Sequence, residues 1–140
     1  MIERDIAQMM INTASASRRV LVADDDPVIR HLVTAIVKTE GYTPVTVEDG
    51  RAAYRLLQHD ANFKAAIFDM MMPHLEGIEI MRHMRTEKRL MRIPVMMITS
   101  EQSPKLLSDS FAAGAAIFLP KPFTAAQLQM MLRMLFSKNN

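Results

Sequence analysis

Four short apolar segments of the chain each end in polar residues of types that carry out chemistry. Carboxylates act as metal ligands, nucleophiles or bases, a hydroxyl group donates a hydrogen bond, and an ammonium group is a positive charge. Taken singly, each of these residues has an ordinary explanation as a helix cap, a turn or a loop residue. Their shared position after successive apolar segments favours one common site. In chain order they are Asp24, Asp25 and Asp26, then Asp69, then Thr99 and Ser100, and finally Lys121.

The carboxylates of Asp24, Asp25 and Asp69 would repel one another if they met at one place. A hard divalent cation removes this conflict. Mg²⁺, or Mn²⁺ in its place, prefers oxygen ligands and typically takes one or two carboxylates, waters and a phosphate oxygen. Lys121 adds a positive charge and Thr99 a hydroxyl donor. Cation, ammonium and hydroxyl are the groups that stabilise a transferring phosphoryl group, and a carboxylate held in line can form an acyl phosphate.

A sheet of alternating strands and helices would bring these residues together. Short β-branched apolar segments alternate with longer amphipathic segments, which predicts five strand–helix units in succession. Strands that are apolar throughout, with helices between them, are typical of a parallel sheet covered on both faces. The chain is therefore expected to form an α/β fold, a doubly wound five-stranded parallel sheet with five helices. The predicted strands are 19–24, 43–47, 65–68, 94–99 and 115–119.

Helix start and stop signals support this alternation. Asp26-Pro27 and Ser103-Pro104 each resemble an N-cap followed by proline in the first turn. Gly41 and Gly114 are expected helix stops. Thr124 with Gln127 predicts a capping box for the last helix. In such a sheet, ligands bind beyond the carboxyl ends of the strands, where all the polar residues above are predicted to lie.

Length and composition agree with one compact domain. The chain has 140 residues, no cysteine and a net charge of +2. The small net charge gives no reason to expect nucleic acid or a membrane surface as a partner. The lack of cysteine excludes disulfides and favours a cytoplasmic location. No apolar run has the length needed to cross a bilayer.

Residues 1–17 lie outside the pattern. Ile2, Ile6, Met9 and Met10 have helical spacing, but the segment is short and ends in TASAS. We expect a flexible or partly helical extension that precedes a domain at 18–138.

The sequence closely resembles the receiver domains of two-component response regulators, the CheY-like family, over about residues 18–138. This resemblance implies the flavodoxin-like form of the predicted sheet. It also implies a signalling module that catalyses only its own phosphotransfer and dephosphorylation, and because the sequence ends soon after the last predicted helix we expect this module to stand alone. The matching segments are VLVADDDPVIR (20–30), AAIFDMMMPHLEGIEIMRHMR (65–85), IPVMMITS (93–100) and AAGAAIFLPKPF (112–123).

The resemblance implies a role for each site residue. Asp69 is the phosphoacceptor, and the donor is a histidine kinase or a histidine phosphotransfer protein. Asp25 ligates Mg²⁺, Asp24 orients a metal-bound water, and the backbone carbonyl of Met71 completes the protein ligands. The remaining roles belong to the phosphorylated state: Thr99 and Lys121 contact phosphoryl oxygens, and Phe118 occupies the aromatic switch position.

Other features of the resemblance concern the surroundings of the site. The Lys121–Pro122 bond is expected to be cis. Ala115 and Ala116 stand where many transcriptional relatives carry acidic residues that pair across a dimer, so that dimer is not expected here. Met71 and Glu101 flank the acceptor at positions expected to tune the lifetime of the acyl phosphate.

The output is expected to be a change in protein–protein contacts, because the sequence ends soon after the last helix. Residues 103–137 carry few charges, and Met130 and Met134 are expected to project outward. An unidentified downstream protein is therefore expected to dock on this face.

Two other functions share part of this set of residues. A haloacid-dehalogenase-type phosphatase would share the aspartate nucleophile and Mg²⁺. It expects a second aspartate two residues later as general acid, where this chain has Met71. A degenerate receiver used as an unphosphorylated scaffold is disfavoured by the intact acidic pair, Thr99 and Lys121.

Overall fold

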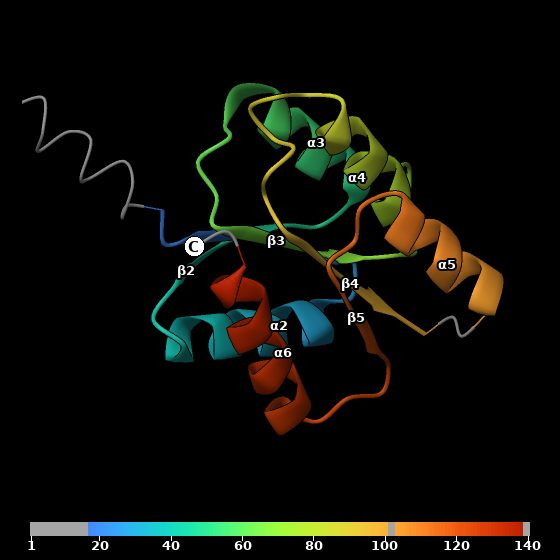
Figure 1. The fold of residues 1–140 in the computed structure, drawn as a ribbon. Coiled ribbons are helices and arrows are strands. Elements are labelled where there is room, and N and C mark those ends of the chain that lie inside the picture. Colours follow the sequence, from blue (N-terminus) through green and yellow to red (C-terminus); the bar gives the residue numbers. More distant parts are fainter. Residues whose placement is uncertain (1–16, 101–102, 139–140) are drawn as a thin grey trace, which may run out of the picture.

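The structure is a computed structural model that describes residues 17–100 and 103–138. Strands and helices alternate along these residues (Figure 1). The strands are β1 (Arg19–Ala23), β2 (Thr43–Val47), β3 (Ala65–Asp69), β4 (Val95–Thr99) and β5 (Ile117–Pro120). The helices are α2 (Pro27–Thr39), α3 (Gly50–His59), α4 (Gly77–Arg85), α5 (Pro104–Ala112) and α6 (Ala125–Ser137).

All neighbouring strands pair in parallel, in the order β2-β1-β3-β4-β5. The predicted doubly wound five-stranded sheet with five helices is therefore confirmed. The strand order reverses between β1 and β3, so the connections leave these two strands in opposite directions. This point of reversal is where open α/β sheets bind ligands, and it is where Asp24 and Asp69 stand.

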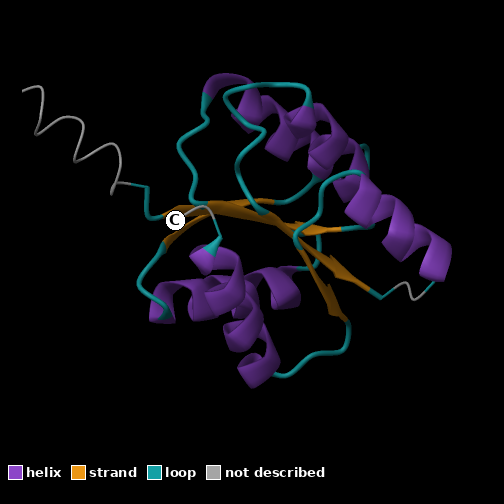
Figure 2. Ribbon diagram, viewed as in Figure 1, coloured by secondary structure: helices purple, strands orange, loops and turns teal. Residues whose placement is uncertain are grey.

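Helices cover both faces of the sheet (Figure 2). On one face, α2 and α6 pack on side chains such as Val22, Ile67 and Ile98. On the other, α3 and α4 bury their apolar sides on Leu21, Phe68 and their neighbours, with part of α5 beside them. Successive side chains of a strand point to opposite faces, which is why β1 is apolar from Val20 onward and β3 is apolar up to Phe68.

The predicted helix signals act as expected. The Asp26 carboxylate accepts a hydrogen bond of 2.9 Å from Val28 N, and Pro27 opens α2. Ser103 caps α5, and Thr124 and Gln127 form the capping box of α6. Gly41 and Gly114, which follow α2 and α5, have φ values of 88° and 116°. Only glycine adopts such values without strain, so both glycines end their helices.

Five strand boundaries differ from the predicted ones by one or two residues, and two of these are the ends of β3 and β5, which lie one residue later at Asp69 and Pro120. β1 ends at Ala23 instead of Asp24, because the chain turns there toward the cap of α2. β4 begins at Val95 instead of Pro94, which has no N–H to donate to a neighbouring strand. β5 begins at Ile117 instead of Ala115, because Ala115 N still bonds to Ser110 O of the preceding turn.

The expected N-terminal extension, residues 1–17, lies outside the described residues except for residue 17. Among the described residues, no helix combines the length and hydropathy required to span a bilayer.

Candidate functional site

The register of the sheet brings three carboxylates together. Ala23 pairs with Phe68, so the next residues, Asp24 and Asp69, follow side by side at the ends of β1 and β3. Asp25 completes the cluster, in which one carboxylate oxygen from each residue lies within 4.8 Å of the others. The predicted convergence of these three residues is therefore present in the structure.

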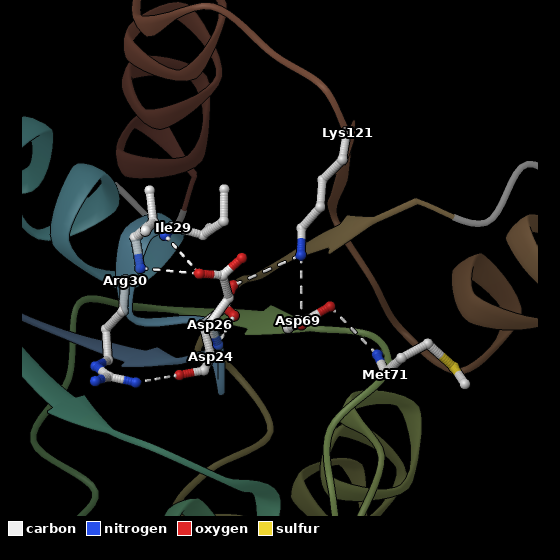
Figure 3. A network of polar contacts seen from close by, with 8 residues as sticks. Asp24, Asp26, Ile29, Arg30, Asp69, Met71 and Lys121 are labelled. Carbon is white, nitrogen blue, oxygen red and sulfur yellow. Dashed lines mark hydrogen bonds and ion pairs between the residues drawn. The ribbon is translucent and has the colours of Figure 1, made fainter.

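The side chain of Lys121, the residue that follows β5, points toward Asp24 and Asp69 (Figure 3). Its Nζ atom lies 3.4 Å from Asp69 Oδ2 and 4.0 Å from Asp24 Oδ2. Thr99 pairs with Pro120, and Lys121 N donates a 2.8 Å hydrogen bond to Thr99 O. These backbone contacts fix the start of the lysine side chain at the carboxyl edge of the sheet.

Backbone groups hold the two buried carboxylates. Asp24 and Asp69 are 2% and 6% exposed, whereas Asp25 is exposed. Asp26 N donates to Asp24 Oδ1 at 2.9 Å, and Met71 N donates to Asp69 Oδ1 at 3.3 Å. Each buried carboxylate therefore has one oxygen tied to the backbone and one directed toward Lys121.

Burial makes the ionised carboxylates costly. It raises the pKa of Asp24 from 3.8 to about 6, and the nearby Asp69 carboxylate adds to the rise. Burial also raises the pKa of Asp69, although the Lys121 ammonium opposes this. A single lysine therefore leaves the cluster with an excess of negative charge.

The cluster fits a small divalent cation. Asp24 Oδ2 is buried and has no hydrogen-bond partner among the described residues. In the part of the chain that the structure describes, its one ion-pair partner is the Lys121 ammonium, 4.0 Å away. Oxygen-only donors with excess negative charge are the ligand set that Mg²⁺ prefers. Receiver domains bind Mg²⁺ at an acidic pocket of this kind. Ligation by the Met71 carbonyl remains a prediction.

The residues of the predicted switch lie close to the cluster. Asp69 pairs with Ile98, so the buried Thr99 is one residue further along the neighbouring strand. Phe118 pairs with Met97 of β4 and is only partly buried. The Lys121–Pro122 bond is cis, as expected.

Two contacts at the site were not anticipated from the sequence. Arg30, in the first turn of α2, donates a 2.8 Å hydrogen bond to Asp24 O. At Gly77, an added Cβ would lie 2.7 Å from Asp69 O, so α4 begins in direct contact with the acceptor's backbone. The sequence signal for Arg30 was its place one turn after the Asp26 cap, but many surface arginines share that position.

The sequence and the fold have clear relatives. The family model described as response regulator receiver domain matches residues 20–133. The chemotaxis protein CheY of Pseudomonas aeruginosa is 30% identical over 123 residues, which are 87% of this chain and 98% of that protein.

Among solved structures, CheY4 of Vibrio cholerae has a TM-score of 0.78 and 32% identity, covering 86% of this chain and 99% of that one. The receiver domain of a sensor histidine kinase from Pseudomonas aeruginosa has a TM-score of 0.76 and 27% identity. That match covers 87% of this chain and 99% of the other, whose structure has a magnesium ion coordinated in its active-site cleft.

Proposed function

Since the chain belongs to the family of response regulator receiver domains, we propose that Asp69 accepts a phosphoryl group from a phosphohistidine. The donor is a histidine kinase or a histidine phosphotransfer protein. The observation that carries this proposal is the buried Asp69 carboxylate, 3.4 Å from Lys121 Nζ and beside two further carboxylates at the switch point of the sheet. Receiver domains generally act in signalling and have no dedicated catalytic function.

In the proposed step, a carboxylate oxygen of Asp69 forms a bond to phosphorus as the phosphorus–nitrogen bond of the donor breaks. The imidazole nitrogen keeps the electron pair of that bond. Lys121 stays beside the acceptor and balances charge on the phosphoryl oxygens. The Thr99 hydroxyl donates to another of these oxygens.

Asp24, Asp25, Asp69 and the Met71 carbonyl would hold the cation. A bound Mg²⁺ would offset charge on the carboxylates and on the phosphoryl oxygens. Asp24 contributes through its buried Oδ2, and Asp25 is the exposed ligand on the side open to solvent.

Phosphorylation then changes the surface near β5. Thr99 moves toward the new phosphoryl oxygens and vacates space, and the partly buried Phe118 ring turns inward. The adjacency of β4 and β5, with Met97 beside Phe118, supports this route from the acceptor to the edge of the sheet.

The outcome is a changed docking face for a downstream protein. Within residues 103–137, Phe111, Met130 and Met134 are exposed on α5 and α6, the helices that flank the edge strand β5. We propose a protein partner in the cytoplasm, and neither nucleic acid nor a membrane, because the net charge is only +2. The test compares the affinity of a downstream partner with and without a phosphate mimic. An unchanged affinity would contradict the proposed docking face.

The acceptor assignment is tested by intact-mass measurement after incubation with acetyl phosphate and Mg²⁺. The unmodified sequence is expected to gain one phosphoryl group, and Asp69→Asn none. Asp60→Asn is a matched control, because Asp60 pairs with Arg19 away from the site. An equal mass gain in Asp69→Asn would rule out Asp69 as the acceptor.

A further inference from the structure

Helix α5 is weakly attached to the rest of the domain. Like α4, it has nine residues, but it buries only Ser110, whereas α4 buries five of its residues. The Ser110 hydroxyl is buried without a hydrogen-bond partner among the described residues. The position of α5 therefore depends mainly on contacts of its partly exposed side chains. The position of α4, in contrast, is fixed by its buried side chains.

One such contact joins α5 to β5. The ring of Phe111 meets the ring of Phe118 edge to face, with centroids 4.7 Å apart and an interplanar angle of 72°. This is a favourable aromatic geometry. Phe111 is 53% exposed, so its ring is not held by a surrounding core. The edge contact thus stabilises Phe118 in the position seen here, at the border between the core and the surface.

We propose that Phe111 is a positioning residue that holds the Phe118 ring in this partly exposed position and so opposes the phosphorylated conformation. This inference rests on the proposed function, in which Phe118 turns inward after phosphorylation. Turning inward separates the two rings. The loss of an aromatic pair corresponds to a change of about 2- to 10-fold in the equilibrium between the two positions.

A consequence concerns the partner. A protein that draws the Phe111 ring away from Phe118 favours the inward position of the Phe118 ring. Because coupling between two binding events is reciprocal, such a partner also favours phosphorylation of Asp69. Phe111 thereby links the docking face to the acceptor through a single ring contact.

The test measures the initial rate of phosphorylation by acetyl phosphate, a small donor that needs no docking surface. Phe111→Ala is expected to raise this rate about 2- to 10-fold, and to lower the beryllofluoride concentration needed for half-saturation by a similar factor. Phe111→Tyr keeps the ring and is expected to restore the original rate. An unchanged or slower rate in Phe111→Ala would overturn the proposal.

A double-mutant cycle tests whether Phe111 acts through its contact with Phe118. In a Phe118→Ala background, Phe111→Ala is expected to change the rate no further, because the ring contact is already lost. An undiminished increase in that background would show that Phe111 acts by another route, and the proposal would be wrong.

A matched control removes an aromatic pair on the opposite face of the sheet. Tyr42 stacks on Phe136 with centroids 3.9 Å apart. Tyr42→Leu is expected to leave the phosphorylation rate unchanged, and an equal increase there would contradict the proposal. If the unmutated protein itself is not phosphorylated at Asp69, the proposed function fails. If it is phosphorylated and Phe111→Ala has no effect, only the present inference fails.

Discussion

The Nζ atom of Lys121 lies 3.4 Å from Asp69 Oδ2 and 4.0 Å from Asp24 Oδ2, so one ammonium group serves two buried carboxylates. These carboxylates come from adjacent strands, and the lysine follows the strand at the edge of the sheet. The charge balance of the site therefore depends on three separate segments of the chain.

Replacing the lysine is expected to weaken the fold in the absence of metal. Lys121→Ala leaves the buried carboxylates without their counter-charge. Because the lysine side chain is 21% exposed, solvent screens part of this charge, and we expect the free energy of unfolding near neutral pH to fall by about 1–2 kcal/mol, between the values for exposed and buried pairs. The difference between the two proteins should narrow as pH falls through about 6, where the Asp24 carboxyl group of the folded protein takes up a proton. Urea denaturation in the presence of a chelator, repeated at several pH values, measures the loss of stability and its pH dependence. Lys105→Ala is the control, because Lys105 is 88% exposed on its side chain and should change little.

Removing the charge of Asp24 is expected to have the opposite effect. Asp24→Asn keeps an oxygen that accepts from Asp26 N and removes a buried charge. We expect the metal-free protein to become more stable near neutral pH, by about 1–3 kcal/mol. A metal-free variant that is less stable than the original at that pH would contradict the electrostatic account.

The stability gained by Asp24→Asn depends on pH because the pKa of Asp24 is shifted in the folded protein. Burial raises the pKa of Asp24 from 3.8 to about 6 in the folded state, so the ionised group disfavours folding above pH about 6. As pH falls through this value, the folded protein takes up the proton and the penalty declines. The advantage of Asp24→Asn should therefore shrink between pH about 7 and about 4. Urea unfolding curves of both proteins, recorded with a chelator across this pH range, measure this advantage.

Mg²⁺ is expected to stabilise the protein by binding only the folded cluster. At a concentration 100 times the dissociation constant, such binding contributes about 2.7 kcal/mol. Asp25→Asn should lose most of this effect, and since Asp25 is exposed the variant should still fold. Melting temperatures with Mg²⁺ and with a chelator measure the difference. Asp109→Asn, on α5, is expected to keep the full response, and the same response in Asp25→Asn would contradict the site.

Gly77→Ala tests the contact between α4 and the acceptor strand. Helix propensity alone favours alanine by about 1 kcal/mol. The structure predicts the reverse, because the added Cβ would lie 2.7 Å from Asp69 O and 3.0 Å from Met97 Cε. We expect a loss of stability together with slower phosphorylation by acetyl phosphate. Arg82→Ala, at an exposed position of the same helix, should change neither.

Much of the fold was predictable because its signals are local. Asp26-Pro27 and the Thr124–Gln127 pair mark helix starts through contacts within one turn of the chain. The apolar strands likewise indicate burial on both faces. The start of β5 was misplaced because Ala115 and Ala116 are as apolar as the strand itself, and only the Ala115 N to Ser110 O bond assigns the first of them to the turn.

The site was predictable only in part. The convergence of Asp24, Asp69 and Lys121 followed from one rule, that the carboxyl ends of parallel strands share an edge. The contacts of Arg30 with Asp24 O and of Phe111 with Phe118 depend on which way two partly or fully exposed side chains turn. Neither residue differs in type or spacing from ordinary helix surface residues, so only the structure identifies them.

The central claim is that Asp69 carries the phosphoryl group, and its most direct test is chemical. Sodium borohydride reduces an aspartyl phosphate to homoserine, which peptide mass spectrometry places at a single position. After incubation with acetyl phosphate and Mg²⁺, we predict homoserine at position 69, and none when Mg²⁺ is removed by a chelator. Homoserine at position 24 or 25, or phosphate retained on a histidine with no homoserine formed, would contradict the account.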